Sequence, residues 1–129
     1  MSDTKPLPHP TEITQPYWDA ARAGRFSLQR CRQCGAVRHY PQLLCTRCYS
    51  DRVEWIEASG RGTVHSWTVA HHAFHPAFKG ELPYTLLIVD LEEGPRAMGR
   101  FDGEPSVLKL GLPVQARFDA DGLPLFGAA

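Results

Sequence analysis

The segment CRQCGAVRHYPQLLCTRC, residues 31–48, carries all four cysteines of the chain in two Cys-x-x-Cys turns. Each turn directs two thiolates toward one point, and two facing turns complete the tetrahedral four-sulfur site that suits zinc. Ten residues lie between Cys34 and Cys45, which is shorter than the commonest four-cysteine spacing but still allows a small zinc ribbon. The segment therefore predicts one structural zinc ion bound by Cys31, Cys34, Cys45 and Cys48.

Three other uses of the same cysteines compete with this interpretation. A redox pair would need one Cys-x-x-Cys turn in a βαβ setting, and no such alternation is present. Disulfides would be expected in a secreted protein, whereas the N-terminal residues MSDTKPLPHP contain no apolar signal segment. An iron–sulfur or rubredoxin-type iron site uses the same four thiolates, so zinc and iron both remain open. Because a closed four-cysteine site leaves no free coordination position, we expect the metal to be structural.

Length and composition are those of one globular domain, or of two small modules joined together. The 129 residues are 43% hydrophobic and 22% charged, and no apolar run is long enough to cross a membrane. The formal net charge is zero, which argues against a partner held mainly by electrostatic attraction. We therefore expect a cytoplasmic protein without a membrane partner.

The charges are unevenly distributed along the chain. Residues 20–62 contain eight arginines and three acidic side chains, a net charge of +5. Residues 81–129 contain four basic and eight acidic side chains, a net charge of −4. A basic ribbon beside an acidic barrel could bind a phosphate-bearing ligand on the ribbon side, but solvated surface arginines explain the same pattern equally well.

The first dozen residues are rich in proline and are expected to form an extended arm. A helix is predicted over Gln15–Ala23, with Thr14 as its cap, Pro16 in its first turn and Gly24 just past its end. After Gly60 the pattern predicts strands and turns alone. The strand ranges predicted for the whole chain are 25–30, 37–40, 53–58, 62–71, 84–91, 97–101, 114–118 and 123–126.

The last five of these strands are what a small closed barrel requires, and the OB-fold is the common five-stranded solution. The predicted fold class is therefore mainly β, with an N-terminal helix, a rubredoxin-like zinc ribbon and a five-stranded OB-fold barrel. The corresponding domain organisation places the arm and helix at residues 1–24, the zinc ribbon at 25–58 and the OB-fold at 59–129.

The order of several motifs resembles a known family of zinc-ribbon and OB-fold proteins that are called acyl-CoA-associated. The matching stretches are YWDAARAGRFSLQRCRQCG at 17–35, CTRC at 45–48, ASGRGTVHSWTV at 58–69, PYTLLIVDLEEGPRAMGRF at 83–101 and GLPVQARF at 111–118. The likeness covers residues 14 to 126. No single motif identifies the family, but the order of the motifs is specific.

This resemblance implies an accessory subunit and not a free-standing catalyst. Members of the family accompany thiolase-superfamily enzymes, among them thiolases, hydroxymethylglutaryl-CoA synthases and lipid-transfer-type thiolases or aldolases that act on steroid side chains. Some are fused or bound to acyl-CoA hydratases. The resemblance thus implies a hetero-oligomer with a thiolase-like or aldolase-like subunit, in which the ribbon and barrel help to form the acyl-CoA site and acyl-CoA is a shared ligand.

The residues themselves suggest where such contacts could occur. The segment 71–80, HHAFHPAFKG, joins the first two barrel strands and offers aromatic rings that could stack on an adenine or line an acyl tunnel, with a lysine that could approach a phosphate. Its three histidines could also hold a second metal or act as a base, although no carboxylate is near in sequence. A loop packed on the barrel or on a protein partner is the simpler explanation. The candidate contact residues are Tyr17, Trp18, His72, Phe74, His75, Phe78, Lys79 and Tyr84.

Two classes of function are compatible with this sequence. The absence of a phosphate loop, a nucleophile elbow, a dinucleotide fingerprint and a spare cysteine predicts no turnover by the isolated chain. The alternative to an accessory subunit is a ribbon–barrel that binds single-stranded nucleic acid on aromatic platforms in a positive groove. The acidic barrel half and the zero net charge favour the accessory subunit.

Overall fold

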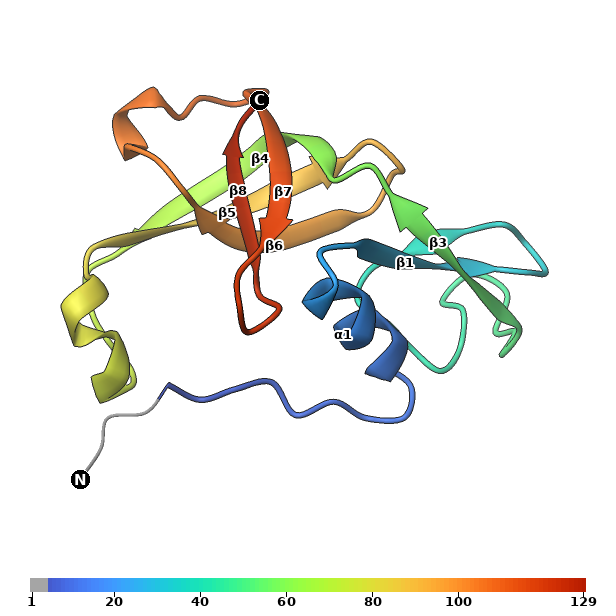
Figure 1. Ribbon diagram of the computed structural model, residues 1–129. Helices are drawn as coiled ribbons and strands as arrows, with labels where there is room; N and C mark the ends of the chain where they lie inside the picture. The colour runs from blue at the N-terminus through green and yellow to red at the C-terminus, as the bar shows by residue number, and fades with distance from the viewer. Residues whose placement is uncertain (1–4) are drawn as a thin grey trace.

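The computed structural model describes residues 5–129, so the part of the predicted arm at residues 1–4 lies outside the described residues. Figure 1 shows an N-terminal helix, a small sheet and a barrel that follow one another along the chain. The elements are α1 (Gln15–Arg22), β1 (Phe26–Cys31), β2 (Val37–Arg38), β3 (Val53–Ala58), β4 (Arg61–Ala70), η1 (Pro76–Glu81), β5 (Tyr84–Leu91), β6 (Arg96–Phe101), η2 (Pro105–Val107), β7 (Pro113–Phe118) and β8 (Pro124–Ala128).

The helix α1 lies where the sequence predicts it, but its cap differs from the expectation. Thr14 occupies the N-cap position without a side-chain bond to the helix; its Oγ1 instead accepts a hydrogen bond from the N–H of Thr11 at 2.9 Å. The expected capping by the Thr14 side chain is therefore wrong. At the other end, the N–H groups of Gly24 and Arg25 donate to the carbonyls of Ala21 and Ala20, which is the Schellman arrangement that ends a helix.

The ribbon sheet has the strand order β2-β1-β3, and both pairings are antiparallel. Its central strand β1 is buried on both faces except at Arg30. Phe26 and Leu28 belong to the hydrophobic core, whereas Gln29 is a buried polar residue. The Gln29 Oε1 accepts hydrogen bonds from Nε of Arg38 and from the N–H of Gln42, so it ties the loop between the two cysteine turns to β1.

The barrel closes in the order β4-β5-β6-β8-β7, with β7 returning to pair with β4. Every pairing is antiparallel except that of β6 with β8. This is the five-stranded OB-fold arrangement, and it confirms the predicted fold class. Strand β5 alternates strictly between half-buried and buried residues, because alternate side chains of a strand face the barrel interior. The interior-facing residues Leu87, Val89, Val114 and Phe126 are completely buried.

The expectation of strands and turns alone after Gly60 is wrong in two places, where short 3₁₀ helices form. Pro76 begins η1 and Pro105 begins η2; proline suits the first turn because its φ is already fixed near the helical value. The Nδ1 of His75 accepts a hydrogen bond from the N–H of Ala77, which caps η1.

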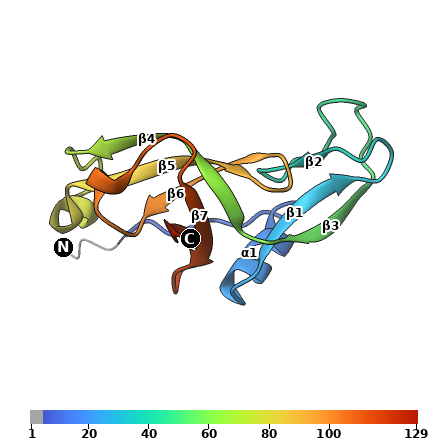
Figure 2. The same cartoon turned by 90° about the horizontal axis from the view of Figure 1, so that it is seen from above.

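Helix α1 packs where the ribbon and the barrel meet (Figures 1 and 2). The Tyr17 ring makes edge-on contacts with Phe26 of the ribbon and Phe118 of the barrel, at centroid distances of 6.2 and 6.5 Å. Tyr17 is only 2% exposed, and the core runs through this junction from one module to the other. The division of the chain at residues 24/25 and 58/59 stays a prediction. Within residues 5–129, no helix is both long enough and apolar enough to span a bilayer.

Candidate metal centre and aromatic groove

The first cysteine turn begins at the last residue of β1. Cys31 donates its N–H to the carbonyl of Ala36, and its own carbonyl accepts from the N–H of Gly35. Gly35 has a φ of +78°, which completes a tight turn behind Cys34. The backbone thus folds back at once into β2, and both thiols of this turn are presented on its inner side.

The second cysteine turn repeats this hydrogen-bond pattern. Cys45 donates its N–H to the carbonyl of Ser50 and accepts from the N–H of Tyr49, both at 2.9 Å. A further bond from the N–H of Arg32 to the carbonyl of Arg52 holds the first turn against the segment that follows the second turn. The two turns are therefore placed opposite one another by backbone hydrogen bonds.

The four cysteine sulfurs lie within 4.8 Å of one another. Cys31 Sγ is 3.5 Å from Cys48 Sγ, and Cys34 Sγ is 3.6 Å from Cys45 Sγ. A tetrahedral ion with metal–sulfur bonds of about 2.3 Å requires sulfurs about 3.8 Å apart, so the donor set fits one such ion. These cysteines form the single cluster of three or more metal-ligating side chains found within residues 5–129. The histidines of segment 71–80 do not form a second one.

The electrostatics of two thiols favour the thiolate form that a metal requires. The hydrogen bond from the N–H of Cys34 lowers the pKa of the Cys31 thiol to about 6. Hydrogen bonds from the backbone N–H of Cys48 and then of Arg47 lower the pKa of the Cys45 thiol. Backbone N–H groups directed at sulfur stabilise its negative charge, so the turns favour the thiolate at Cys31 and Cys45, whereas burial and the neighbouring thiols raise the pKa of Cys48.

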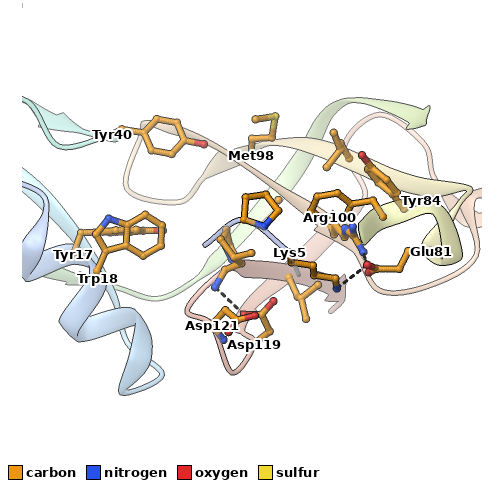
Figure 3. Close-up of a pocket in the computed structure, with 17 residues that line it drawn as sticks. Lys5, Tyr17, Trp18, Tyr40, Glu81, Tyr84, Met98, Arg100, Asp119 and Asp121 are labelled. Carbon is orange, nitrogen blue, oxygen red and sulfur yellow. Dashed lines mark hydrogen bonds and ion pairs between the residues drawn. The ribbon is translucent and has the colours of Figure 1, made fainter. Parts of the chain in front are cut away.

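A second feature is a groove of about 550 Å³ between α1, the ribbon and the outer face of the barrel. One side carries the rings of Tyr17, Trp18 and Tyr40, and the opposite side carries Tyr84 and its neighbours (Figure 3). The floor is formed by outward-facing residues of β5, β6 and β8, namely Leu86, Met98 and Leu125, together with the backbone of Gly99. In OB-folds generally this face, formed by the second and third strands and the adjacent loops, is the one that binds ligands.

Polar groups gather at the Tyr84 end of this groove. The Glu81 carboxylate pairs with Lys5 Nζ and with Arg100 Nη1, each at 2.6 Å. Lys5, and after it Arg100, lowers the pKa of the Glu81 carboxyl below its ordinary value. The Arg100 guanidinium also lies 4.2 Å from the Tyr84 ring centroid and 5.6 Å from that of Phe78. This end of the groove thus holds two cations against one carboxylate.

The structure divides the eight candidate contact residues into two groups. Tyr17, Trp18, Phe78 and Tyr84 line the groove. The other four lie on or beside the segment between β4 and η1: Phe74 is 92% exposed, His72 and Lys79 are exposed, and His75 is half-buried with its Nδ1 bonded to the Ala77 N–H. The contact roles of all eight residues stay predictions.

Sequence reasoning missed the remaining groove residues, chiefly Lys5, Tyr40, Glu81, Met98 and Arg100. The alternation of RAMGRF in β6 holds a usable signal, because it places Met98 and Arg100 outward beside one another. An outward methionine on a barrel strand indicates a surface that is not simply solvated. Tyr40 and Lys5 come from segments far apart in the chain, and no local pattern connects them with β6.

The comparisons with known proteins agree with this architecture. The family model described as the ChsH2 rubredoxin-like zinc ribbon domain matches residues 18–54, and the model described as the ChsH2 C-terminal OB-fold domain matches residues 55–119. The fold and the cysteine cluster thus define a protein of the zinc-ribbon and OB-fold class. The chain belongs to the ChsH2 (DUF35) family, which confirms the resemblance found in the sequence.

Several relatives align with most of this chain. A chain of the solved Ltp2-ChsH2(DUF35) aldolase is 36% identical, with a TM-score of 0.82 over 94% of this chain and 98% of that one. The probable enoyl-CoA hydratase alpha subunit of Thermomonospora curvata is 40% identical over 76% of this chain and 30% of its own length. The benzoylsuccinyl-CoA thiolase subunit BbsA of Geobacter metallireducens is 29% identical over 74% of this chain and 66% of its own. The chain spans only about a third of the length of the hydratase alpha subunits that it matches.

Proposed function

We propose that this chain is a non-catalytic accessory subunit that assembles with a thiolase-superfamily enzyme, either a thiolase or a lipid-transfer-type thiolase or aldolase, and helps to form its acyl-CoA site. The observation that carries the proposal is the similarity, over nearly the whole of both chains, to a chain of the Ltp2-ChsH2(DUF35) aldolase. The similarity to a subunit of a thiolase supports the same class of partner.

The composition of the cysteine cluster supports a structural role for the metal ion of the zinc ribbon. A zinc ion bound by Cys31, Cys34, Cys45 and Cys48 would have four thiolate ligands and no open position for a substrate or a water molecule. It would cross-link β1, the two turns and the segment before β3. Four free cysteines that serve as ligands suit a reducing compartment, which favours the cytoplasm.

The groove is the part of this chain that we propose to contact acyl-CoA. Its aromatic and aliphatic lining offers an apolar surface for an acyl chain or a base, and Lys5 and Arg100 offer cations at one end. A pocket of several hundred cubic ångströms with a few convergent polar groups is the usual form of a small-molecule site. Because the groove faces outward, a partner subunit could complete its open side.

The assembly proposal is tested by co-expression of the chain with each thiolase-type subunit of its host. We expect one such subunit to elute with the chain as a stoichiometric complex during size-exclusion chromatography. A matched co-expression with an unrelated enzyme of similar size is the control. If the chain elutes alone with every thiolase-type subunit, the proposed function is wrong.

The groove proposal is tested by two substitutions that introduce the same charge at exposed positions. Met98→Glu places a carboxylate inside the groove, whereas Val107→Glu places one on η2, outside it. We expect calorimetric binding of propionyl-CoA by the assembled complex to weaken about tenfold for Met98→Glu, because a like charge faces the phosphates. Val107→Glu should bind as the wild type does. Equal affinity in both variants would show that acyl-CoA does not use this groove.

A further inference from the structure

The two cysteine turns differ at one equivalent position. In the first turn the residue after the second cysteine is Gly35, with a φ of +78°; in the second turn it is Tyr49, with a φ of +62°. Both residues donate their N–H to the carbonyl of the first cysteine of their turn. Tyr49 is the single non-glycine residue with a positive φ among the described residues. A bulky side chain in this region is strained, and glycine is the ordinary choice.

The strain at Tyr49 is not offset by packing within the chain. Its side chain is 76% exposed, and it makes no aromatic contact with another ring of the described chain. Strained residues that gain nothing in their own fold are found mostly at functional sites. The second turn thus displays an aromatic ring to the outside at a position where glycine would be more stable.

Two exposed leucines lie on the same loop as Tyr49. Leu43 is 62% exposed and Leu44 is 46% exposed, directly before Cys45. Because Cys45 is hydrogen-bonded to both Tyr49 and Ser50, the backbone of Leu44 runs next to that of Tyr49. All three side chains are exposed on the loop between β2 and β3, whose later part lies at the end of the ribbon away from the barrel (Figure 2).

Three arginines lie on or beside the two cysteine turns. Arg32 belongs to the first turn, Arg47 to the second, and Arg52 is bonded through its carbonyl to the N–H of Arg32. All three are exposed, and none forms an ion pair among the described residues. Asp51 is the one acidic residue between Cys31 and Val53. We call the three apolar and three arginine residues together the ribbon tip.

We propose that the ribbon tip is a docking surface for the thiolase-type subunit, and that it fits an apolar pocket rimmed by carboxylates on that subunit. This inference rests on the proposed function and adds the surface and the chemistry of contact. An exposed aromatic anchor beside aliphatic side chains, with arginines at the rim, is the composition of an interface hot spot. Nucleic acid is a poorer fit, because two leucines have no counterpart on a phosphate backbone and stack poorly on bases.

Tyr49→Gly distinguishes a structural role of the tyrosine from a docking role. A structural role predicts a lower stability of the variant, whereas a docking role predicts an equal or higher one. Glycine relieves the positive φ, so the melting temperature should stay the same or rise. The dissociation constant for the purified thiolase-type subunit, measured by calorimetry, should increase at least about tenfold. Leu44→Ser should weaken binding in the same direction. Leu110→Ser, at a 72% exposed leucine on the barrel, is the matched control and should leave the affinity unchanged.

Each contrary result has a distinct meaning. Wild-type affinity in Tyr49→Gly overturns this proposal and leaves the accessory-subunit function standing. A large fall in its melting temperature with loss of metal would show that the tyrosine is structural, which also overturns it. A wild-type chain that binds no thiolase-type subunit removes both proposals. If Tyr49→Gly instead loses binding to a labelled single-stranded oligonucleotide while subunit affinity is unchanged, the ribbon tip is a nucleic-acid surface and the proposal is wrong.

Discussion

The backbone N–H of Ser59 donates a hydrogen bond to Oε2 of Glu93 at 2.8 Å, and this bond connects the end of the ribbon to the turn between β5 and β6. The Ser59 carbonyl accepts from Nε2 of Gln115 at 2.9 Å. Both backbone polar groups of the linking residue are thus held by the barrel. Because Ser59 follows β3 directly, these bonds fix the direction in which the ribbon leaves the barrel.

Glu93→Ala should lower the stability of the protein by about 1–3 kcal/mol, because it leaves the partly buried N–H of Ser59 without an acceptor. The measurement is urea unfolding followed by circular dichroism. Glu92→Ala is the control: Glu92 is exposed and bonds the Ser59 hydroxyl and Arg61, so we expect a clearly smaller loss of stability. Equal effects of the two substitutions would contradict the role given to Glu93.

His39 lies in the junction beneath the aromatic rings of Tyr17, Phe26 and Tyr40, at centroid distances of 3.9 to 5.4 Å. Both of its ring nitrogens are buried without a hydrogen-bond partner. Desolvation by this burial lowers the pKa of His39 to about 4. The folded protein therefore holds a neutral imidazole, while the unfolded chain binds a proton at about pH 6.5.

Stability should consequently fall as the pH drops from about 6.5 toward 4, because in this window the unfolded state binds the proton and the folded state does not. His39→Phe removes this titration and the unpaired nitrogens. We expect the variant to equal or exceed the wild type at pH 7.5, and to lose less stability at pH 5, by on the order of 1–3 kcal/mol. Thiol protonation affects both proteins alike. If the free energies of unfolding of the two proteins change with pH in parallel, His39 is not held neutral in the folded protein.

Removal of the metal should unfold the ribbon, since structural zinc contributes on the order of 10 kcal/mol to small modules. Elemental analysis should find one zinc per chain in the wild type and almost none in Cys45→Ser. Thr46→Ser, within the same turn, is the matched control and should keep its zinc. Absorption bands of an iron–thiolate centre in the purified protein, or a fully folded and metal-free wild type, would contradict the assignment.

Gly99 forms part of the groove floor at a point where two strands approach closely. A Cβ at this position would lie 2.8 Å from the Pro124 carbonyl oxygen and 2.9 Å from the Phe126 ring. Gly99→Ala should therefore destabilise the barrel by about 1–3 kcal/mol, because the parallel pairing of β6 and β8 must open. Gly127→Ala, on β8, meets nothing within 4 Å and should be tolerated. Thermal unfolding of the two variants checks this, and equal melting temperatures would contradict it.

The fold was predictable because the cysteine spacing and the turn residues each indicate the strand arrangement that the whole chain adopts. The spacing of Cys31, Cys34, Cys45 and Cys48 determines the ribbon, and the turn residues between apolar stretches determine the barrel strands, whose predicted ends differ by at most two residues from those observed. The short helices η1 and η2 were missed, because a single proline after a loop marks a turn without specifying its type. The side-chain role expected of Thr14 was wrong because Thr11 competes for its hydroxyl.

The site was predictable only where its residues are adjacent in sequence. The cysteines come as two local pairs, whereas the groove joins α1, the segment after β2, and the barrel strands β5, β6 and β8. Trp18 and Tyr84 were candidates as isolated aromatics, and nothing in the sequence placed them on one groove. Tyr49 was not singled out, because its importance lies in a backbone angle that the sequence does not reveal.

The accessory-subunit function is tested most directly by the acyl-CoA turnover of the purified thiolase-type subunit while this chain is added to it stepwise. We expect no turnover by this chain alone, and a turnover rate of the mixture that rises and then levels off once the two proteins are equimolar. Turnover by the chain without its partner, or a partner whose rate is indifferent to the added chain, would contradict the central claim.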